Sequence, residues 1–246
     1  MNRPRLLVSV RNAAEVSDAA EADLLDLKEP SRGSLGMASP EMFDAVFQAV
    51  QRLPAQSRPQ LSAALGEVID WETPALRTID RADWLRGFSY LKLGMAGLRN
   101  QANWVERWRS TLRFIDEISP EKSQTWVAVA YADADRVSAP SVRAILEAAP
   151  TVGCGGFLID TAVKDHTRLH DHLSTADLQE LIAAAKSHGL FVALAGRLTI
   201  DDLSHWRDLP ANIWAVRSAV CHGSDRTQLI DPARVTECRK RLQFVA

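Results

Sequence analysis

Eight short apolar runs of six to eight residues recur along the 246-residue chain, and they constrain its fold more than any other feature. The runs are almost continuously apolar, which is typical of parallel strands buried on both faces. We therefore predict strands at Arg5–Val10, Ala22–Lys28, Gln60–Leu65, Phe88–Leu93, Trp126–Tyr131, Gly156–Thr161, Leu190–Ala195 and Ile213–Val220.

The segments between these runs have helical patterns. Asn103–Ile118 carries Trp104 and Trp108 on the same face, and Ser174–His188 starts with a capping sequence and is followed by a glycine. The segment Val68–Trp84 has no clear pattern. The remaining predicted helices are Ala13–Ala20, Pro40–Leu53, Ser138–Ala149, Thr199–Leu209 and Asp231–Leu242.

Strands and helices in strict alternation predict an α/β fold. Eight such units in a chain of this length fit a single (β/α)8 barrel, a TIM barrel, and we predict one domain over residues 1–246. An open, doubly wound sheet is the alternative. The count of eight, with no linker or change in composition, favours the closed barrel.

Composition limits the class of partner. The formal net charge is −2, so a nucleic-acid partner bound through bulk positive charge is not expected. No apolar stretch reaches 18 residues, so we expect no membrane partner either. Three dispersed cysteines indicate a reducing compartment, and we predict a cytoplasmic protein. A homo-oligomer remains open.

The chain uses 23 arginines but only six lysines, so the position of each lysine is informative. Lys28, Lys92 and Lys164 lie at or just beyond the ends of the second, fourth and sixth predicted strands. In (β/α)8 barrels the active site lies at these carboxyl ends. A lysine in an apolar strand is costly unless it is paired. We therefore interpret these three lysines as candidate catalytic residues.

Two aspartates accompany the lysines. Asp26 and Lys28 are two residues apart, so both point to the same face of a strand, and Asp160 is close to Lys164. A desolvated lysine among other cations has a lowered pKa and forms Schiff bases with aldehydes or ketones, while a second lysine or a carboxylate moves protons. The alternative is that the lysines form ordinary ion pairs.

The ends of the first, seventh and eighth strands predict a phosphate site. Loops after the last two strands often hold phosphate in barrels, and Arg197, Arg217 and Arg226 could add positive charge. The alternative is that the glycines only turn the chain. The candidate substrate- or phosphate-binding residues are Ser9, Gly196, Arg197, Arg217, Ser218 and Gly223.

We predict neither a metal nor a cofactor. His166, His170 and His172 form a cluster, but a solvated polar loop explains it better than a zinc site. The glycines between Gly153 and Gly156 precede a strand, so they lack the dinucleotide-binding context.

Several motifs, in the same order along the chain, resemble the (5-formylfuran-3-yl)methyl phosphate synthase family. The most specific is DLKEPSRGSLG, which covers Asp26–Gly36. The others are LLVSVRNAAE at Leu6–Glu15, YLKLG at Tyr90–Gly94, LIDTAVKD at Leu158–Asp165, ALAG at Ala193–Gly196 and RSAVC at Arg217–Cys221.

This resemblance implies a barrel lyase that joins two glyceraldehyde 3-phosphate molecules into a phosphorylated furan aldehyde for methanofuran-type cofactors. It implies that Lys28 forms the Schiff base and that Lys92 transfers protons, with Asp26, Asp160 and Lys164 in support.

Two positions depart from the family pattern. Arg197 stands where a small polar residue is expected, and Ser218 stands where a glycine is expected. These departures keep open a class I aldolase-like barrel acting on another phosphosugar. A non-catalytic barrel that binds phosphorylated metabolites is a third hypothesis.

Overall fold

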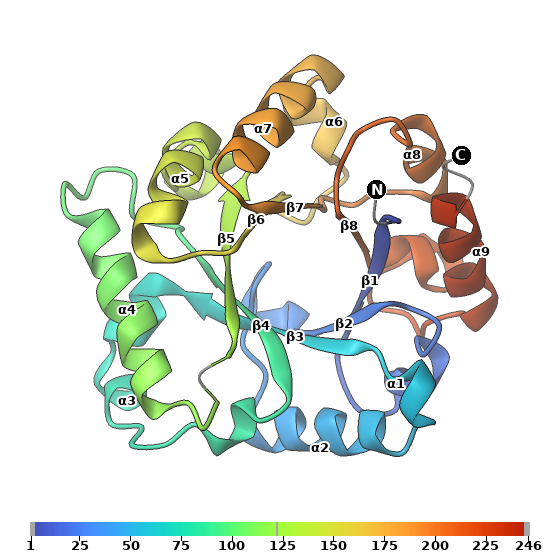
Figure 1. The fold of residues 1–246 in the computed structure, drawn as a ribbon, viewed down its shortest axis with the longest axis horizontal. Coiled ribbons are helices and arrows are strands. Elements are labelled where there is room, and N and C mark those ends of the chain that lie inside the picture. The colour runs from blue at the N-terminus through green and yellow to red at the C-terminus, as the bar shows by residue number, and fades with distance from the viewer. Residues whose placement is uncertain (1–2, 122, 244–246) are drawn as a thin grey trace.

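A computed structural model describes residues 3–121 and 123–243. Within them, eight parallel strands form a closed barrel in sequence order, as Figure 1 shows. The strands are β1 Arg5–Val10, β2 Leu24–Leu27, β3 Gln60–Glu67, β4 Phe88–Gly94, β5 Thr125–Tyr131, β6 Gly156–Asp160, β7 Phe191–Leu194 and β8 Ile213–Val216. Because β1 pairs with β8 through Leu6–Trp214 and its neighbours, the sheet has no free edge. The barrel is therefore confirmed, and the open doubly wound sheet is excluded.

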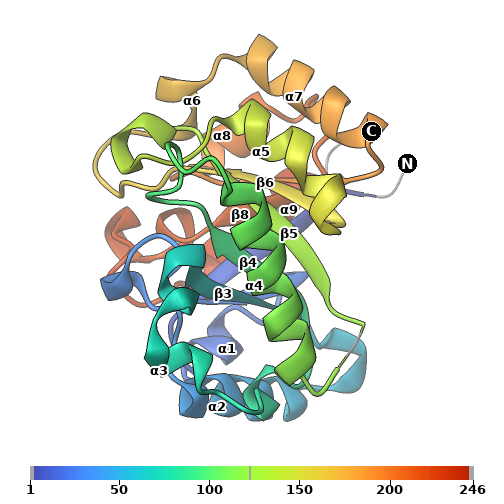
Figure 2. The same cartoon turned by 90° about the vertical axis from the view of Figure 1, so that its left-hand side faces the viewer.

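Helices surround the barrel and cover the outer faces of its strands (Figures 1 and 2). Several start at side chains that accept backbone N–H groups; Ser174, for example, accepts the N–H of Asp177. The α-helices are α1 Glu15–Asp18, α2 Pro40–Gln51, α3 Pro74–Arg77, α4 Trp104–Ile118, α5 Val142–Ala148, α6 Leu169–His172, α7 Thr175–Ser187, α8 Ile200–His205 and α9 Pro232–Gln243.

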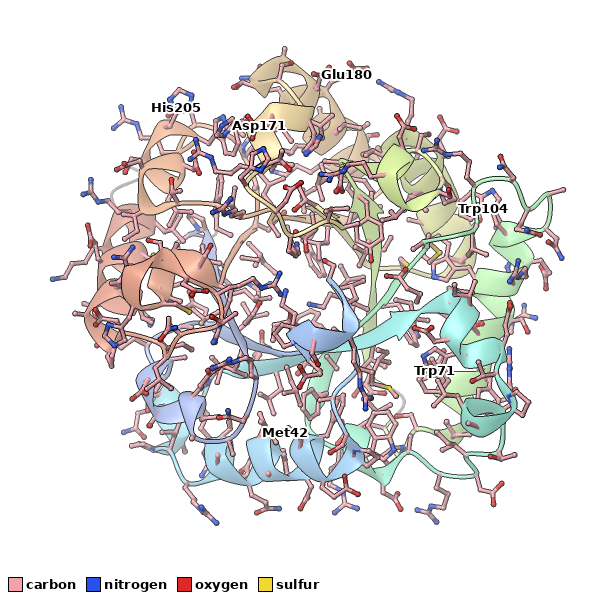
Figure 3. All side chains as sticks on the ribbon, turned by 180° about the vertical axis from the view of Figure 1, so that it is seen from behind. Met42, Trp71, Trp104, Asp171, Glu180 and His205 are labelled. Carbon is pink, nitrogen blue, oxygen red and sulfur yellow. The ribbon has the colours of Figure 1, made fainter. Side chains whose placement is uncertain are left out.

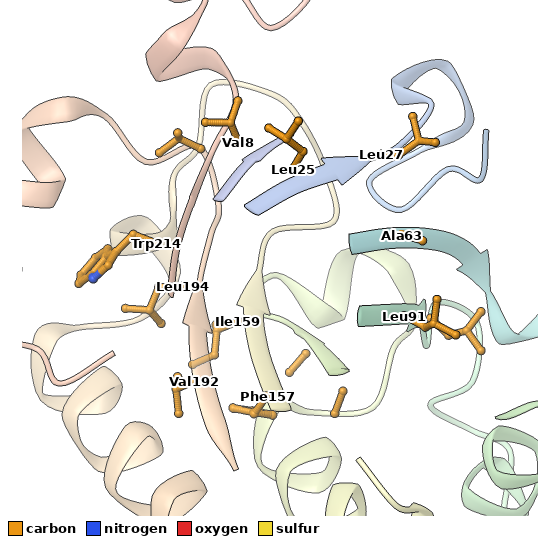
Figure 4. Close-up of a cluster of buried hydrophobic side chains, with 14 of the residues drawn as sticks. Val8, Leu25, Leu27, Ala63, Leu91, Phe157, Ile159, Val192, Leu194 and Trp214 are labelled. Atoms are coloured by element: carbon orange, nitrogen blue, oxygen red, sulfur yellow. The ribbon is translucent and has the colours of Figure 1, made fainter. Parts of the chain in front are cut away.

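The apolar residues of each strand alternate between two cores, because successive side chains point to opposite faces. One set faces the helices; it includes Val8, Leu25, Leu91 and Ile159, which are fully buried and are labelled in Figure 4. The other set faces the barrel interior and includes Leu7, Leu24, Val127, Leu158 and Ile213. The apolar runs are nearly continuous because both faces of every strand are covered.

Gly156 gives the interior its shape at the start of β6. A Cβ atom at this position would lie 2.3 Å from the ring of Phe191, so only glycine leaves room for that ring. The ring packs edge-on against Tyr90 of β4, with 5.6 Å between the ring centroids. These aromatic rings occupy the amino-terminal part of the barrel and leave its carboxyl end open to other groups.

Several predicted elements are shorter in the structure; the helix predicted at Thr199–Leu209, for example, ends at His205. Two further parts of the sequence prediction change. The eighth strand was expected to reach Val220, but β8 ends at Val216 because Arg217 leaves the extended conformation, with φ −137° and ψ −68°. A 3₁₀ helix at Ser218–Val220 follows. The patternless stretch Val68–Trp84 consists of short turns of helix around α3.

The outermost side chains belong to the helical ring. In Figure 3, Trp104, Glu180 and His205 lie at the rim of the molecule, away from the barrel axis, whereas Met42 of α2 packs against the core. Trp104 stacks on Trp108, with 6.2 Å between ring centroids, so this pair packs helix α4 and does not form a ligand cage. Among the described residues, no helix is both long enough and apolar enough to span a bilayer.

Candidate active site

A cavity of about 530 Å³ occupies the carboxyl end of the barrel and extends into its interior. This volume falls within the range of small-molecule sites. Its floor is apolar, and its wall carries the polar groups. All the residues predicted to act in catalysis or binding line this cavity: Ser9, Asp26, Lys28, Lys92, Asp160, Lys164, Gly196, Arg197, Arg217, Ser218 and Gly223.

Asp26 of β2 and Lys92 of β4 form a buried ion pair. Strand β3 lies between them and contributes only small side chains at this height. Ser62 is in register with Asp26, and Ala64 is in register with Lys92. Because neither side chain on β3 fills the space, the lysine reaches across this strand to the carboxylate.

Asp160 and Lys164 form a second pair at the end of β6, with 2.9 Å between Nζ and Oδ1. The Lys164 ammonium also donates to the carbonyl oxygen of Thr161 at 2.5 Å, and the Ser34 hydroxyl donates to the second oxygen of Asp160 at 3.4 Å. Burial raises the pKa of Asp160, but Lys164 and Lys28 together bring that pKa below its usual value. Asp160 is therefore an anion that orients Lys164 at the cavity wall.

Lys28 directly follows β2 and is the candidate for the nucleophilic amine of the site. Its side chain is buried, and within residues 3–121 and 123–243 its ammonium makes no hydrogen bond or ion pair. Burial lowers the pKa of Lys28 to about 8; Asp160 and Asp26 oppose this shift, whereas Lys164 and Lys92 favour it. At neutral pH roughly a tenth of the molecules then carry an uncharged, nucleophilic amine at this position.

Arg217 does not present a donor to the cavity, although it was predicted to bind phosphate. Its guanidinium donates to both carboxylate oxygens of Glu15, at 2.6 and 2.9 Å. It also donates to the carbonyl oxygens of Ser9, Arg226 and Gln228, at 3.0, 3.1 and 3.0 Å. All five N–H groups of the guanidinium are used in this way. In this arrangement Arg217 has none left for a phosphate.

The loop after β7 has a backbone that favours glycine at Gly196, where φ is +103°. A Cβ atom there would lie 3.1 Å from the Cβ of Leu169, so the loop packs closely on helix α6. Arg197 also has positive φ and donates to the carbonyl oxygen of Asp165 at 2.8 Å. Its exposed side chain thus lies along the cavity rim.

Ser9 and Ser218 lie on opposite sides of the junction between β1 and β8. Ser9 is buried, and Ser218 begins the 3₁₀ helix that replaces the end of the predicted strand. Gly223 has φ +62° and open space around it, so the loop after β8 can approach a ligand closely.

Several residues that build the site were missed from the sequence. Glu15 holds Arg217 although the two are 202 positions apart, so no local spacing could reveal the pair. Asp133 accepts the N–H groups of Ala162 and Val163 at 2.6 and 2.9 Å and so fixes the loop that carries Lys164. An acidic residue two positions after the end of the fifth strand was the available signal.

A third buried pair lies at the ends of β3 and β5, outside the cavity wall. The Tyr131 hydroxyl donates to Glu67 at 2.6 Å, and a Cβ atom at Gly94 would lie 2.3 Å from that hydroxyl. Burial raises the pKa of Glu67. The close fit indicates that this pair ties the strand ends together.

None of the three clustered histidines is among the residues that line the cavity. His170 and His172 belong to the short helix α6, and the His172 ring lies 3.2 Å from the Thr167 hydroxyl. Among the residues that the structure describes, no group of three His, Cys, Asp or Glu side chains has the geometry of a metal site.

The closed barrel, with charged side chains at the carboxyl ends of its strands, defines the class of the protein as a (β/α)8 barrel. Similar barrels include phosphoribosyl anthranilate isomerase from Thermotoga maritima, with a TM-score of 0.60, 13% identity and 98% coverage of both chains. 3-Hexulose-6-phosphate synthase from Salmonella typhimurium has a TM-score of 0.59 at 13% identity, covering 97% of this chain and 98% of the other. At these identities the likeness concerns the fold alone.

Sequence similarity assigns the family. Residues 6–239 match the model of the 4-HFC-P synthase family, and this chain belongs to that family. The (5-formylfuran-3-yl)methyl phosphate synthase of Methanopyrus kandleri is 35% identical over 228 residues, which cover 92% of this chain and 93% of the relative. The enzyme of the same name from Methanocaldococcus jannaschii is 32% identical over 239 residues, covering 96% and 98%. The resemblance inferred from the motifs is thereby confirmed.

Proposed function

We propose that this chain is a lyase that converts two molecules of glyceraldehyde 3-phosphate into (5-formylfuran-3-yl)methyl phosphate through a Schiff base on Lys28. Membership of the 4-HFC-P synthase family and the names of the relatives support the product. The buried, unpaired amine of Lys28 in a cavity lined by two further lysines supports the chemistry. That amine is the single observation that carries the mechanism.

In the first step the uncharged Lys28 amine attacks the aldehyde carbon of one triose phosphate, and water leaves as the iminium forms. The iminium withdraws electrons and acidifies the neighbouring C–H bond. The Asp26–Lys92 pair is available to take this proton because it lines the same cavity. The resulting enamine then expels phosphate from the next carbon, and phosphate leaves with the electron pair of the broken C–O bond.

In the later steps a proton transfer moves the carbonyl group of the second triose to its C2, and C3 of the first triose, freed of phosphate, bonds to that carbon. Ring closure through the terminal hydroxyl of the second triose, followed by dehydration, gives the furan. With every phosphate counted in its neutral acid form, the atoms of two triose phosphates equal those of one furan product, one phosphoric acid and two water molecules. No oxidant or reductant is needed, so the chemistry requires no redox cofactor. Asp160 and Lys164, which line the same cavity, would hold hydroxyl or phosphate groups while these bonds change.

The phosphate of the retained triose would bind between the loops after β7 and β8. Gly196 and Gly223 allow the backbone to approach the ligand, and Ser9, Ser218 and the rim residue Arg197 add polar groups. The apolar floor beneath them suits the furan ring, which is uncharged. The product would then serve a furan-containing one-carbon cofactor of the methanofuran type, and the enzyme would work in the cytoplasm.

The test is turnover with glyceraldehyde 3-phosphate alone. Furan absorbance and inorganic phosphate should appear in equal amounts, and Lys28→Ala should reduce both by at least roughly 10³-fold, as expected when a covalent nucleophile is lost. Lys186→Ala is the matched control, because Lys186 is exposed on α7, and it should retain wild-type turnover. Near-wild-type turnover by Lys28→Ala would refute the mechanism. A borohydride-trapped adduct on Lys28 without furan formation would instead favour an aldolase-like reaction on another phosphosugar.

A further inference from the structure

The segment between β8 and α9 forms a loop over one side of the cavity. The loop is closed at its base by an antiparallel bridge between Cys221 and Ile230. Within it, the Asp225 carboxylate accepts the N–H and the hydroxyl of Thr227, at 2.9 and 2.8 Å, so its tip has a defined shape. Residues 223–227 line the cavity.

Two arginines hold three consecutive carbonyl groups of this loop. Arg217 donates to the carbonyl oxygens of Arg226 and Gln228, and Arg11 donates to that of Thr227 at 2.9 Å. Glu15 in turn binds both arginines, because Arg11 donates to its carboxylate at 3.0 and 3.1 Å. Glu15 and Arg217 are buried, so their contacts are protected from water and salt. The backbone of the loop is thus fixed to the ends of β1 and β8.

Arg226 is the cationic side chain that this loop presents. It is half-buried in the cavity wall, and within the described part of the chain its guanidinium makes no hydrogen bond or ion pair. Asp160, across the cavity, attracts it, while Arg217 repels it. A guanidinium removed from water without a hydrogen-bonded partner is unfavourable, and a planar fork of free donors matches a phosphate. The side chain therefore has the properties of a ligand-binding group.

We propose that Arg226 binds the phosphate group of the substrate and that Arg217, with Glu15, is a positioning residue that fixes Arg226 for this contact. The proposal rests on the proposed function and assigns its phosphate specificity. It replaces direct phosphate binding by Arg217, whose five N–H groups are already used. The Arg226 carbonyl is itself an acceptor of Arg217, so the position of the phosphate-binding side chain depends directly on that hydrogen bond.

The experiment compares Arg226→Gln, Arg226→Lys and Arg217→Lys with the control Arg207→Gln, whose side chain is exposed beside Asp208. The dissociation constant for inorganic phosphate is measured by calorimetry on each folded variant. Borohydride trapping on Lys28 then gives the half-saturating concentrations of glyceraldehyde 3-phosphate and of glyceraldehyde, which lacks the phosphate.

Arg226→Gln should weaken phosphate binding about 30-fold, as expected for a lost pair of charge-assisted hydrogen bonds, and should raise the half-saturating triose phosphate concentration similarly. The half-saturating concentration of glyceraldehyde for Arg226→Gln should change less than about twofold. Arg226→Lys should recover part of the loss because it keeps a point charge. Arg207→Gln should match the wild type. Unchanged phosphate binding by Arg226→Gln, or an equal loss with glyceraldehyde, would overturn the assignment.

The role of Arg217 has its own readout. If Arg217 acts through Arg226, Arg217→Lys should weaken phosphate binding, and adding Arg226→Gln to it should cause little further loss. Fully multiplicative losses would overturn the positioning role, since they would mean that the two residues act separately. Should the wild type form no furan, the proposed function fails, but the phosphate titrations still decide whether Arg226 binds the anion.

Discussion

The ammonium group of Lys92 on β4 forms an ion pair with the carboxylate of Asp26 on β2, although β3 lies between the two strands. The pair exists because β3 carries only Ser62 and Ala64 at this height. Small residues in the middle strand thus decide where a proton-transferring pair can form. The predictions that follow concern the side chains of β3, the Asp26–Lys92 pair and the amine of Lys28.

A larger side chain on β3 should separate the pair. Ala64→Leu would fill the space that Lys92 crosses, so we expect at least a 100-fold loss of turnover with destabilisation of about 1–3 kcal/mol from overpacking. Ala64→Gly should keep the pair and most of the activity. Furan formation and urea unfolding measure the two effects. Normal turnover in a folded Ala64→Leu protein would show that the pair is not needed.

Removing one member of the pair should destabilise the fold strongly. Lys92→Met or Asp26→Leu alone leaves an uncompensated buried charge, which costs about 3–5 kcal/mol. The double variant should recover most of this stability and yet remain inactive. Chemical denaturation of the two single variants and the double variant measures the coupling. The account would be contradicted if the free energy of unfolding of the double variant fell by the sum of the two single losses.

Trapping of the substrate on Lys28 should depend on pH. Because burial first, and then the neighbouring lysines, lower the pKa of this amine to about 8, the free base grows with pH up to that value. The trapping rate should rise about tenfold per pH unit below pH 8 and level off above it. A rate that keeps rising to pH 10 would indicate an amine of ordinary pKa.

The same shift makes a prediction about stability. The folded pKa of Lys28 is about 8 and its usual value is 10.5, so the unfolded chain binds more protons between these pH values. The wild-type free energy of unfolding should therefore rise with pH across this window, relative to Lys28→Met. Below pH 8 the variant should be more stable by roughly 3 kcal/mol. A difference that does not vary between pH 8 and 10.5 would contradict the lowered pKa.

Much of the fold was predictable because eight nearly continuous apolar runs have few arrangements that bury both faces. The end of β8 was not, since Arg217 turns the chain out of the strand to reach Glu15, and that partner lies far away in the sequence. The short helix α1 carries Glu15, and no local pattern in it indicates this contact with Arg217.

The candidate site was predictable to the extent that charge in an apolar strand is costly. That cost drew attention to Lys28, Lys92 and Asp26, which the structure brings to one cavity. The same argument could not distinguish an arginine whose N–H groups are all hydrogen-bonded within the protein from one whose N–H groups can bind a ligand. Arg217 and Arg226 look alike in the sequence, and only their hydrogen bonds separate them.

The most direct test of the central claim is to map the lysine that carries the substrate. The enzyme is incubated with glyceraldehyde 3-phosphate and borohydride, and peptides are analysed by mass spectrometry. We predict one reduced triose adduct on Lys28, absent from Lys28→Ala and retained in Lys186→Ala. An adduct on Lys92 or Lys164 in the wild type, or no adduct during active turnover, would contradict the Schiff-base mechanism.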